Sequence, residues 1–104
     1  MSPFVEESLK YLTERVNLSG LHSNDEDTIK VTLRVIKNQG ETLDPGEIES
    51  WALSNNWQPK PLKNLVNWAT AVSAGGRVQL KFKNMAPSEA QILNRIEERL
   101  GSNA

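Results

Sequence analysis

Signals that start and stop helices recur along the whole chain, and they constrain its fold more than any other feature. A helix start is marked by a proline in the first turn, or by a capping residue with Glu or Gln three positions later. A helix end is marked by Gly or Asn, which tolerate the left-handed backbone conformation. Together with apolar residues at helical spacing, these signals predict helices over residues 3–18, 24–38, 45–56, 59–74 and 88–100.

Three capping pairs give the most specific of these signals. In each pair two side chains satisfy backbone N–H groups that the first turn leaves free. The expected pairs are Ser23 with Glu26, Asp44 with Glu47, and Ser88 with Gln91. The expected stops are Gly20, Gly40, Asn55-Asn56 and Gly75-Gly76.

The segment 24–38 fits two periodicities. Ile29, Val31, Leu33 and Val35 alternate with polar residues, as in a half-buried strand. Ile29 and Leu33 also share one helical face, and the capping pair together with the following glycine favours a helix. The local pattern favours a helix and leaves the strand open.

Residues 77–83 alternate strictly between polar and apolar side chains, which indicates a short extended segment. Its apolar residues are Val78, Leu80 and Phe82. We expect these side chains to pack onto helices; the alternative is pairing with a second copy across a dimer axis. The protein is therefore expected to be a monomer or a homodimer.

The length of 104 residues suits one domain, and we expect residues 1–104 to form a compact all-α bundle of about five helices, frayed at 101–104. The chain has no Cys, so it uses neither disulfides nor thiolate metal sites. No apolar run approaches the about 18 residues that a membrane span needs. No signal peptide is visible. These features predict a cytoplasmic protein that does not enter a membrane.

Residues with catalytic or ligand chemistry do not cluster along the sequence. The single histidine, His22, lies in a polar stretch and is interpreted as an ordinary surface residue. No spacing of His, Asp and Glu supplies a metal set, no Gly-rich loop opens a helix, and no nucleophile motif is present. We therefore expect a protein that is not an enzyme and has no cofactor or metal.

Charge is segregated although the net charge is only −1. Residues 50–85 contain five Lys or Arg and no acidic residue. This can be an ordinary solvated surface or a basic patch for an acidic partner. Trp57 either seals a helix junction, which is favoured, or is a partly exposed anchor. The candidate interaction surface, for an unidentified protein partner, comprises Trp57, Lys60, Lys63, Asn64, Asn67, Arg77, Lys81 and Lys83.

Nucleic acid is the alternative partner, through a helix-turn-helix-like pair at 47–70. Ala52 supplies the small residue of the first helix, and Asn56 falls at the turn position that favours a positive φ. Against this, Pro59 and Pro61 occupy the first turn of the supposed recognition helix, and the net charge is slightly acidic. A protein partner is favoured over DNA or RNA.

One ordered set of residues comprises Trp57-Gln58-Pro59, Trp68-Ala69, Gly75, Arg77 and Leu80-Lys81. Its order and spacing resemble the signature of the YoaC-like family of small uncharacterised bacterial proteins. The resemblance covers about residues 28–83. It implies an all-helical fold and a helical segment 24–38, and it brings no activity or cofactor.

Overall fold

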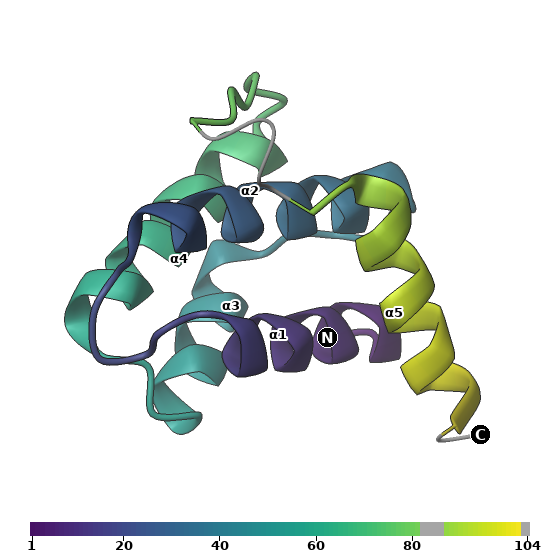
Figure 1. Ribbon diagram of the computed structural model, residues 1–104, viewed down its shortest axis with the longest axis horizontal. Coiled ribbons are helices and arrows are strands. Elements are labelled where there is room, and N and C mark those ends of the chain that lie inside the picture. The colour runs from purple at the N-terminus through teal and green to yellow at the C-terminus, as the bar shows by residue number, and fades with distance from the viewer. Residues whose placement is uncertain (82–86, 103–104) are drawn as a thin grey trace.

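The computed structural model describes residues 1–81 and 87–102, and these ranges contain five α-helices joined by short connections (Figure 1). No strand occurs in the same ranges, which confirms the expected all-α bundle. In chain order the helices are α1 (Pro3–Arg15), α2 (Ser23–Asn38), α3 (Pro45–Ser54), α4 (Pro59–Ser73) and α5 (Glu89–Ser102).

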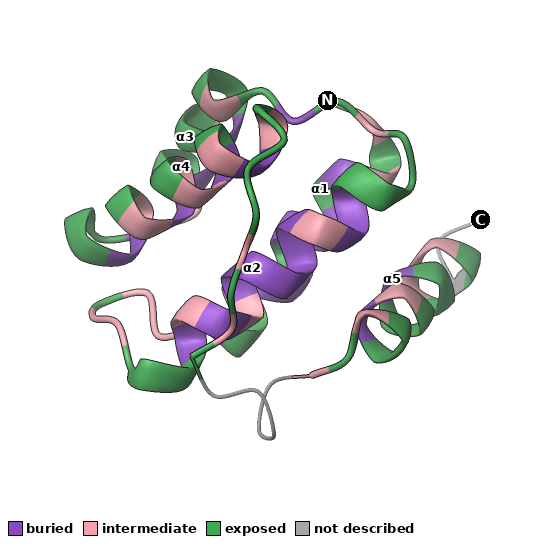
Figure 2. Ribbon diagram, turned by 90° about the horizontal axis from the view of Figure 1, so that it is seen from above, coloured by how far each residue is buried: buried purple, intermediate pink, exposed green. Residues whose placement is uncertain are grey.

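Helix α2 is the central element, because it packs against α1, α4 and α5. Helix α5 also packs against α1, so it covers one end of the α1–α2 pair (Figure 1). Helix α3 packs against α4, and these two helices form the other side of the molecule. The arrangement leaves α3 and α4 with broad outer surfaces, which Figure 2 shows largely exposed.

The central position of α2 explains its ambiguous apolar pattern. Ile29, Leu33 and Ile36 belong to the larger core, which α1, α3 and α4 share. Val31 and Val35 belong to a smaller core beneath α5. Because two opposite faces of one helix are buried, apolar residues alternate along the sequence as they would in a strand. The expected helix is confirmed, and the strand alternative is wrong.

Helix α1 ends at Arg15, so the predicted extension to residue 18 and the stop at Gly20 are wrong. The chain leaves the helix early because the backbone N–H of Asn17 donates to Asp25 Oδ2 at 3.2 Å. This hydrogen bond ties the end of α1 to the first turn of α2, so a tertiary contact sets a boundary that the local signal places later.

The start of α2 is displaced by one residue from the predicted capping pair Ser23–Glu26. The N-cap is His22, and its backbone N–H donates to Asp25 Oδ2 at 3.0 Å. Glu26 instead lies 3.2 Å from Lys30 Nζ. The carboxylate of Asp25 thus accepts hydrogen bonds from the N-cap residue and from the chain that follows α1. These two bonds explain why Asp25, rather than Glu26, is the capping acid of α2.

Other helix ends agree with the sequence. At the start of α3, Asp44 Oδ1 accepts the N–H groups of Gly46 at 2.9 Å and Glu47 at 3.3 Å, which is the Asp44 half of the predicted pair. The Glu47 carboxylate instead lies 3.9 Å from the N-terminal amine. Ser88 and Gln91 bond reciprocally at the start of α5, with backbone-to-side-chain distances of 3.1 and 3.2 Å. Asn56, after α3, has the expected positive φ of 69°. These boundaries are encoded by a few adjacent residues, which is why the sequence predicts them.

Two glycines close α4 and direct the chain into residues 77–81. Gly75 has φ 82°, and its N–H donates to Val72 O at 3.0 Å. The N–H of Gly76 donates to Ala71 O at 2.8 Å. This pair of bonds is the Schellman motif, which satisfies the last free carbonyl groups of a helix.

Helix α5 continues to Ser102, past the predicted end at residue 100. Residues 103–104, and 82–83 of the predicted extended segment, lie outside the described residues. Residues 77–81 form neither helix nor strand. Within the described ranges, none of the helices combines the length and the apolar character that crossing a bilayer requires.

Candidate functional site

The acid-free surface expected from the sequence divides into two parts. Lys60, Lys63 and Asn67 are exposed on the outer face of α4, since residues three and four positions apart share a helical face. Arg77 and Lys81 are also exposed, but they lie beyond the opposite end of α4. The structure therefore brings the first three residues together and separates them from the last two.

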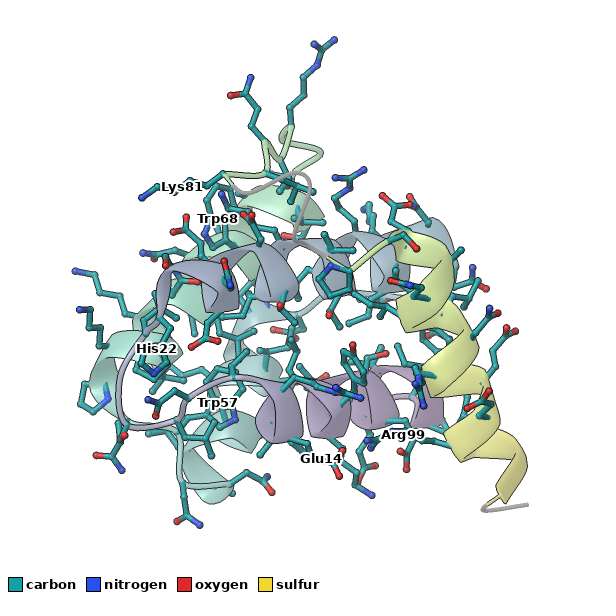
Figure 3. The ribbon with its side chains drawn as sticks, viewed as in Figure 1. Glu14, His22, Trp57, Trp68, Lys81 and Arg99 are labelled. Carbon is teal, nitrogen blue, oxygen red and sulfur yellow. The ribbon has the colours of Figure 1, made fainter. Side chains whose placement is uncertain are left out.

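Trp57 does not belong to the exposed surface. Its side chain is 3% exposed, and its indole Nε1 donates to Thr13 Oγ1 at 3.0 Å (Figure 3). The tryptophan thus joins the turn between α3 and α4 to α1. The favoured interpretation, sealing of the helix junction, is confirmed, and its place among exposed interaction residues is corrected.

Asn64 and Lys83 are the remaining residues of the expected surface. Asn64 is only half-exposed, and within the described residues its Oδ1 is buried without a hydrogen-bond partner. It therefore turns partly toward the protein rather than wholly outward. Lys83 lies outside the described residues.

An apolar groove of about 410 Å³ lies between α3 and α4. Leu53 of α3 is 58% exposed there, and with Leu62 and Val66 it forms a continuous apolar patch, which is more informative than one exposed leucine. The buried positions of α3 are Ile48 and Ala52, so the next residue faces away from the core. The groove is lined by Glu49, Leu53, Trp57, Pro59, Leu62, Lys63, Val66 and Asn67.

A second hollow, of about 470 Å³, lies where residues 77–81 pass over α2 and α4. Its lining combines three basic residues with one aromatic ring and contains no acidic residue from the described part of the chain. It shares no residue with the groove between α3 and α4. The lining residues are Lys30, Trp68, Arg77, Gln79, Leu80 and Lys81.

Lys30 anchors the backbone of this segment although sequence reasoning did not single it out. Its side chain is buried, and its Nζ donates to Gln79 O at 2.9 Å. The ammonium also lies 3.2 Å from Glu26 Oε1 and 4.2 Å from the ring centroid of Trp68. A buried charge is costly unless it is paired, and these three contacts compensate the burial of the lysine ammonium.

Asp27, one turn earlier on α2, is the second anchor. It is fully buried, and its Oδ1 accepts the backbone N–H of Lys81 at 2.9 Å. Val78 packs against the larger core and Leu80 against the smaller core, as expected. The spacing of Asp27 and Lys30, three positions apart on one helical face, was visible in the sequence. It did not identify an anchor, because an acidic residue near the start of a helix is also explained by the favourable charge it places there.

Metal-ligating side chains do not gather in the described ranges: no group of three or more His, Asp or Glu residues there is arranged to hold an ion. His22 is exposed, and its Nε2 lies 2.9 Å from Asn17 Nδ2. The histidine thus contributes to the connection between α1 and α2.

The fold and these two hollows define a small all-α domain with an apolar groove and a basic hollow on its surface. Residues 1–96 match a family described as a domain of unknown function (DUF1889), and the chain belongs to this family. The match includes α1 and much of α5, so it extends beyond the 28–83 range of the YoaC-like resemblance, and it does not carry that name. No curated protein and no solved structure matches the chain.

Proposed function

We propose that this protein is a non-enzymatic cytoplasmic module that binds another protein, and that the groove between α3 and α4 receives an amphipathic helix of that partner. The observation that carries the proposal is Leu53, which is 58% exposed in an apolar groove. We also propose that the YoaC-like proteins and the DUF1889 family are one group, because both are uncharacterised and both include residues 57–81 of this chain.

The groove offers apolar surface that the protein itself leaves uncovered. Leu53, Leu62 and Val66 come from two helices that pack side by side, so they form the two walls of the groove. Covering one such side chain fully stabilises a complex by about 1.5–3 kcal/mol. Partner helices are commonly held in this way, through apolar residues at helical spacing laid along a groove.

Charge at the rim supplies an orientation for the partner helix. Glu49 lies on the α3 wall and Lys63 on the α4 wall. An amphipathic helix that carries basic residues along one border of its apolar stripe and acidic residues along the other therefore fits in one direction. Such complementarity affects specificity and association rate more than total affinity.

Site-specific photo-crosslinking in the native host tests the proposal. A photoreactive phenylalanine analogue at position 53 is expected to capture a discrete partner, whereas the same analogue at Ala90, exposed on α5, is not. Leu53→Asp is expected to weaken capture of that partner at least tenfold, while Ala90→Asp adds the same charge elsewhere as a control. If Leu53→Asp retains every partner of the wild type, the groove is not the binding site.

Nucleic acid binding through α3 and α4 is the second candidate. It is supported by Asn56, which has φ 69° in the turn between these helices, and by Ala52 of α3, which is fully buried. The outer face of α4 offers only Lys60 and Lys63 as cations, which is little for phosphate recognition. Fluorescence anisotropy with random-sequence DNA and RNA at low salt is the test. This candidate is removed if the affinity does not fall with added salt, or if Lys60→Glu together with Lys63→Glu leaves binding unchanged.

A further inference from the structure

Residues 77–81 follow an extended path across α2, which Figure 2 shows as a nearly straight trace over that helix. Val78 and Leu80 are half-buried against the two cores. Arg77, Gln79 and Lys81 are exposed. The segment thus has the alternation of a strand although no strand lies beside it in the described part of the chain.

The backbone of this segment is paired through Gln79 and Lys81, on the edge that faces side chains of α2. Gln79 O accepts from Lys30 Nζ, and the Lys81 N–H donates to Asp27 Oδ1, so side chains of α2 take the place of a neighbouring strand. In an extended chain the N–H and C=O groups of alternate residues point to opposite edges. The groups of Val78 and Leu80 therefore point away from this pairing.

The opposite edge has unsatisfied backbone groups. Among the residues that the structure describes, neither Val78 nor Leu80 has a backbone hydrogen-bond partner. An unpaired edge with alternating donors and acceptors is a template for another extended chain. Because α2 already holds the segment in place, a partner strand does not have to order it.

Charge selects the occupant of this edge. If a second copy paired antiparallel about Gln79, Arg77 would face Lys81 at both ends, and parallel pairing would bring identical charges together. Like charges directly opposite one another destabilise a strand pair. The hollow beside the segment combines Lys30, Arg77 and Lys81 without an acidic residue from the described part of the chain, so an acidic strand meets complementary charge there. Glu26 and Asp27 of α2 lie on the other, already paired side, where they contact Lys30 and the Lys81 N–H. A nucleic acid backbone offers acceptors without the N–H donors that the carbonyl groups of the edge require.

We propose that the outer edge of residues 77–81 binds an extended acidic segment of a partner protein by strand addition. The acidic side chains of that segment lie beside Arg77 and Lys81, and its backbone pairs with Val78 and Leu80. The adjacent hollow beside Trp68 accommodates one of its side chains. This site is independent of the groove between α3 and α4, with which it shares no residue.

Synthetic pentapeptides with an N-terminal fluorophore provide the test on the full chain. The first probe is Glu-Val-Glu-Val-Glu, the second replaces each Glu by Lys, and the third replaces the two Val residues, which face Val78 and Leu80, by Pro. Anisotropy is expected to show at least tenfold tighter binding of the first probe than of the other two. In hydrogen exchange followed by NMR, the amides of Val78 and Leu80 are expected to become protected on binding.

Charge-reversal variants complete the design. Arg77→Glu together with Lys81→Glu is expected to weaken binding of the Glu probe at least tenfold and to favour the Lys probe. Lys60→Glu together with Lys63→Glu makes the same charge change on α4 and is expected to leave the preference unchanged. Leu53→Asp, which tests the groove, is also expected to leave the preference for the Glu probe unchanged. The experiments therefore distinguish failure of the strand-addition proposal from failure of the groove proposal.

Four results would overturn the proposal. The first is equal binding of the proline-containing probe, which lacks the N–H groups that would pair with Val78 and Leu80. The second is a lack of protection at Val78 and Leu80. The third is tighter binding of a random single-stranded oligonucleotide than of the Glu probe at this edge. The fourth is a dimer in light scattering that Arg77→Glu alters, because a second copy would then occupy the edge.

Discussion

Substitution of Gly75 and Gly76 by alanine tests the link between the end of α4 and the placement of residues 77–81. Gly75 has φ 82°, and an L-residue pays about 1–2 kcal/mol for that conformation. A Cβ added at Gly76 would lie 2.9 Å from Ala71 O, a backbone atom that cannot swing away. Both substitutions therefore oppose the Schellman motif, by different mechanisms.

The expected magnitudes follow from these two observations. Replacing Gly by Ala also reduces the entropy of the unfolded chain, and this effect offsets about 0.4–1 kcal/mol of the destabilisation. We expect Gly75→Ala to lower the free energy of unfolding by about 1 kcal/mol. Forcing a methyl group into an occupied space costs about 1–3 kcal/mol, so we expect Gly76→Ala to lower it by about 1–2 kcal/mol. For a domain of this size, 1 kcal/mol lowers Tm by about 4–8 °C.

Urea unfolding followed by tryptophan fluorescence measures these changes, and two variants serve as controls. Gly20 has no atom within 4 Å of its added Cβ and no left-handed φ, so Gly20→Ala is expected to be neutral or stabilising. Gly75→Asn introduces a residue that tolerates the left-handed region, so it is expected to lower the free energy of unfolding less than Gly75→Ala does. The reasoning is refuted if Gly75→Ala is as stable as Gly20→Ala, or if Asn and Ala at position 75 are equally destabilising.

Three further predictions concern contacts that connect distant parts of the chain or begin a helix. Trp57→Phe removes the hydrogen bond to Thr13 and is expected to lower the free energy of unfolding in urea by about 1 kcal/mol, whereas Trp57→Ala is expected to lower it by about 3–5 kcal/mol. Asp27→Ala is expected to accelerate hydrogen exchange of the Lys81 amide, measured by NMR, because it removes the acceptor of that N–H. Asp27→Asn keeps an acceptor oxygen and is expected to accelerate exchange much less. Equal exchange rates in wild type and Asp27→Ala would show that this hydrogen bond does not protect the amide. Ser88→Ala is expected to lower Tm by the equivalent of about 1 kcal/mol, because it removes the N-cap of α5, and an unchanged Tm would show that the cap contributes nothing.

Most of the fold was predictable because its boundaries are local. A proline, a capping side chain or a left-handed Asn or Gly acts within a few positions of the helix end that it sets. Asn56 and Gly75 are examples, since both have the positive φ that the sequence requires of them. The end of α1 was not predictable, because Asp25 sets it from the next helix through Asn17.

The candidate sites were harder to predict because they depend on contacts between distant residues. Lys30 and Gln79 are separated by 49 positions, and Asp27 and Lys81 by 54. No local sequence pattern predicts that Asp27 and Lys30 are buried and hold residues 77–81 against α2. Hydrophobicity alone also did not show whether Trp57 is buried or exposed. The structure shows that it is buried, although it helps to line the neighbouring groove.

The two sites lie on either side of α4, since Asn67 lines the groove and Trp68, the next residue, lines the basic hollow. One partner chain with an amphipathic helix and a nearby acidic strand can therefore engage both. Linking two weak contacts in one chain makes the second association intramolecular, and the combined affinity exceeds either one by about 10²–10⁴-fold when the linker spans the sites. In that case Leu53→Asp combined with Arg77→Glu weakens binding of the whole partner by more than either substitution alone, whereas each short peptide responds only to the substitution in its own site.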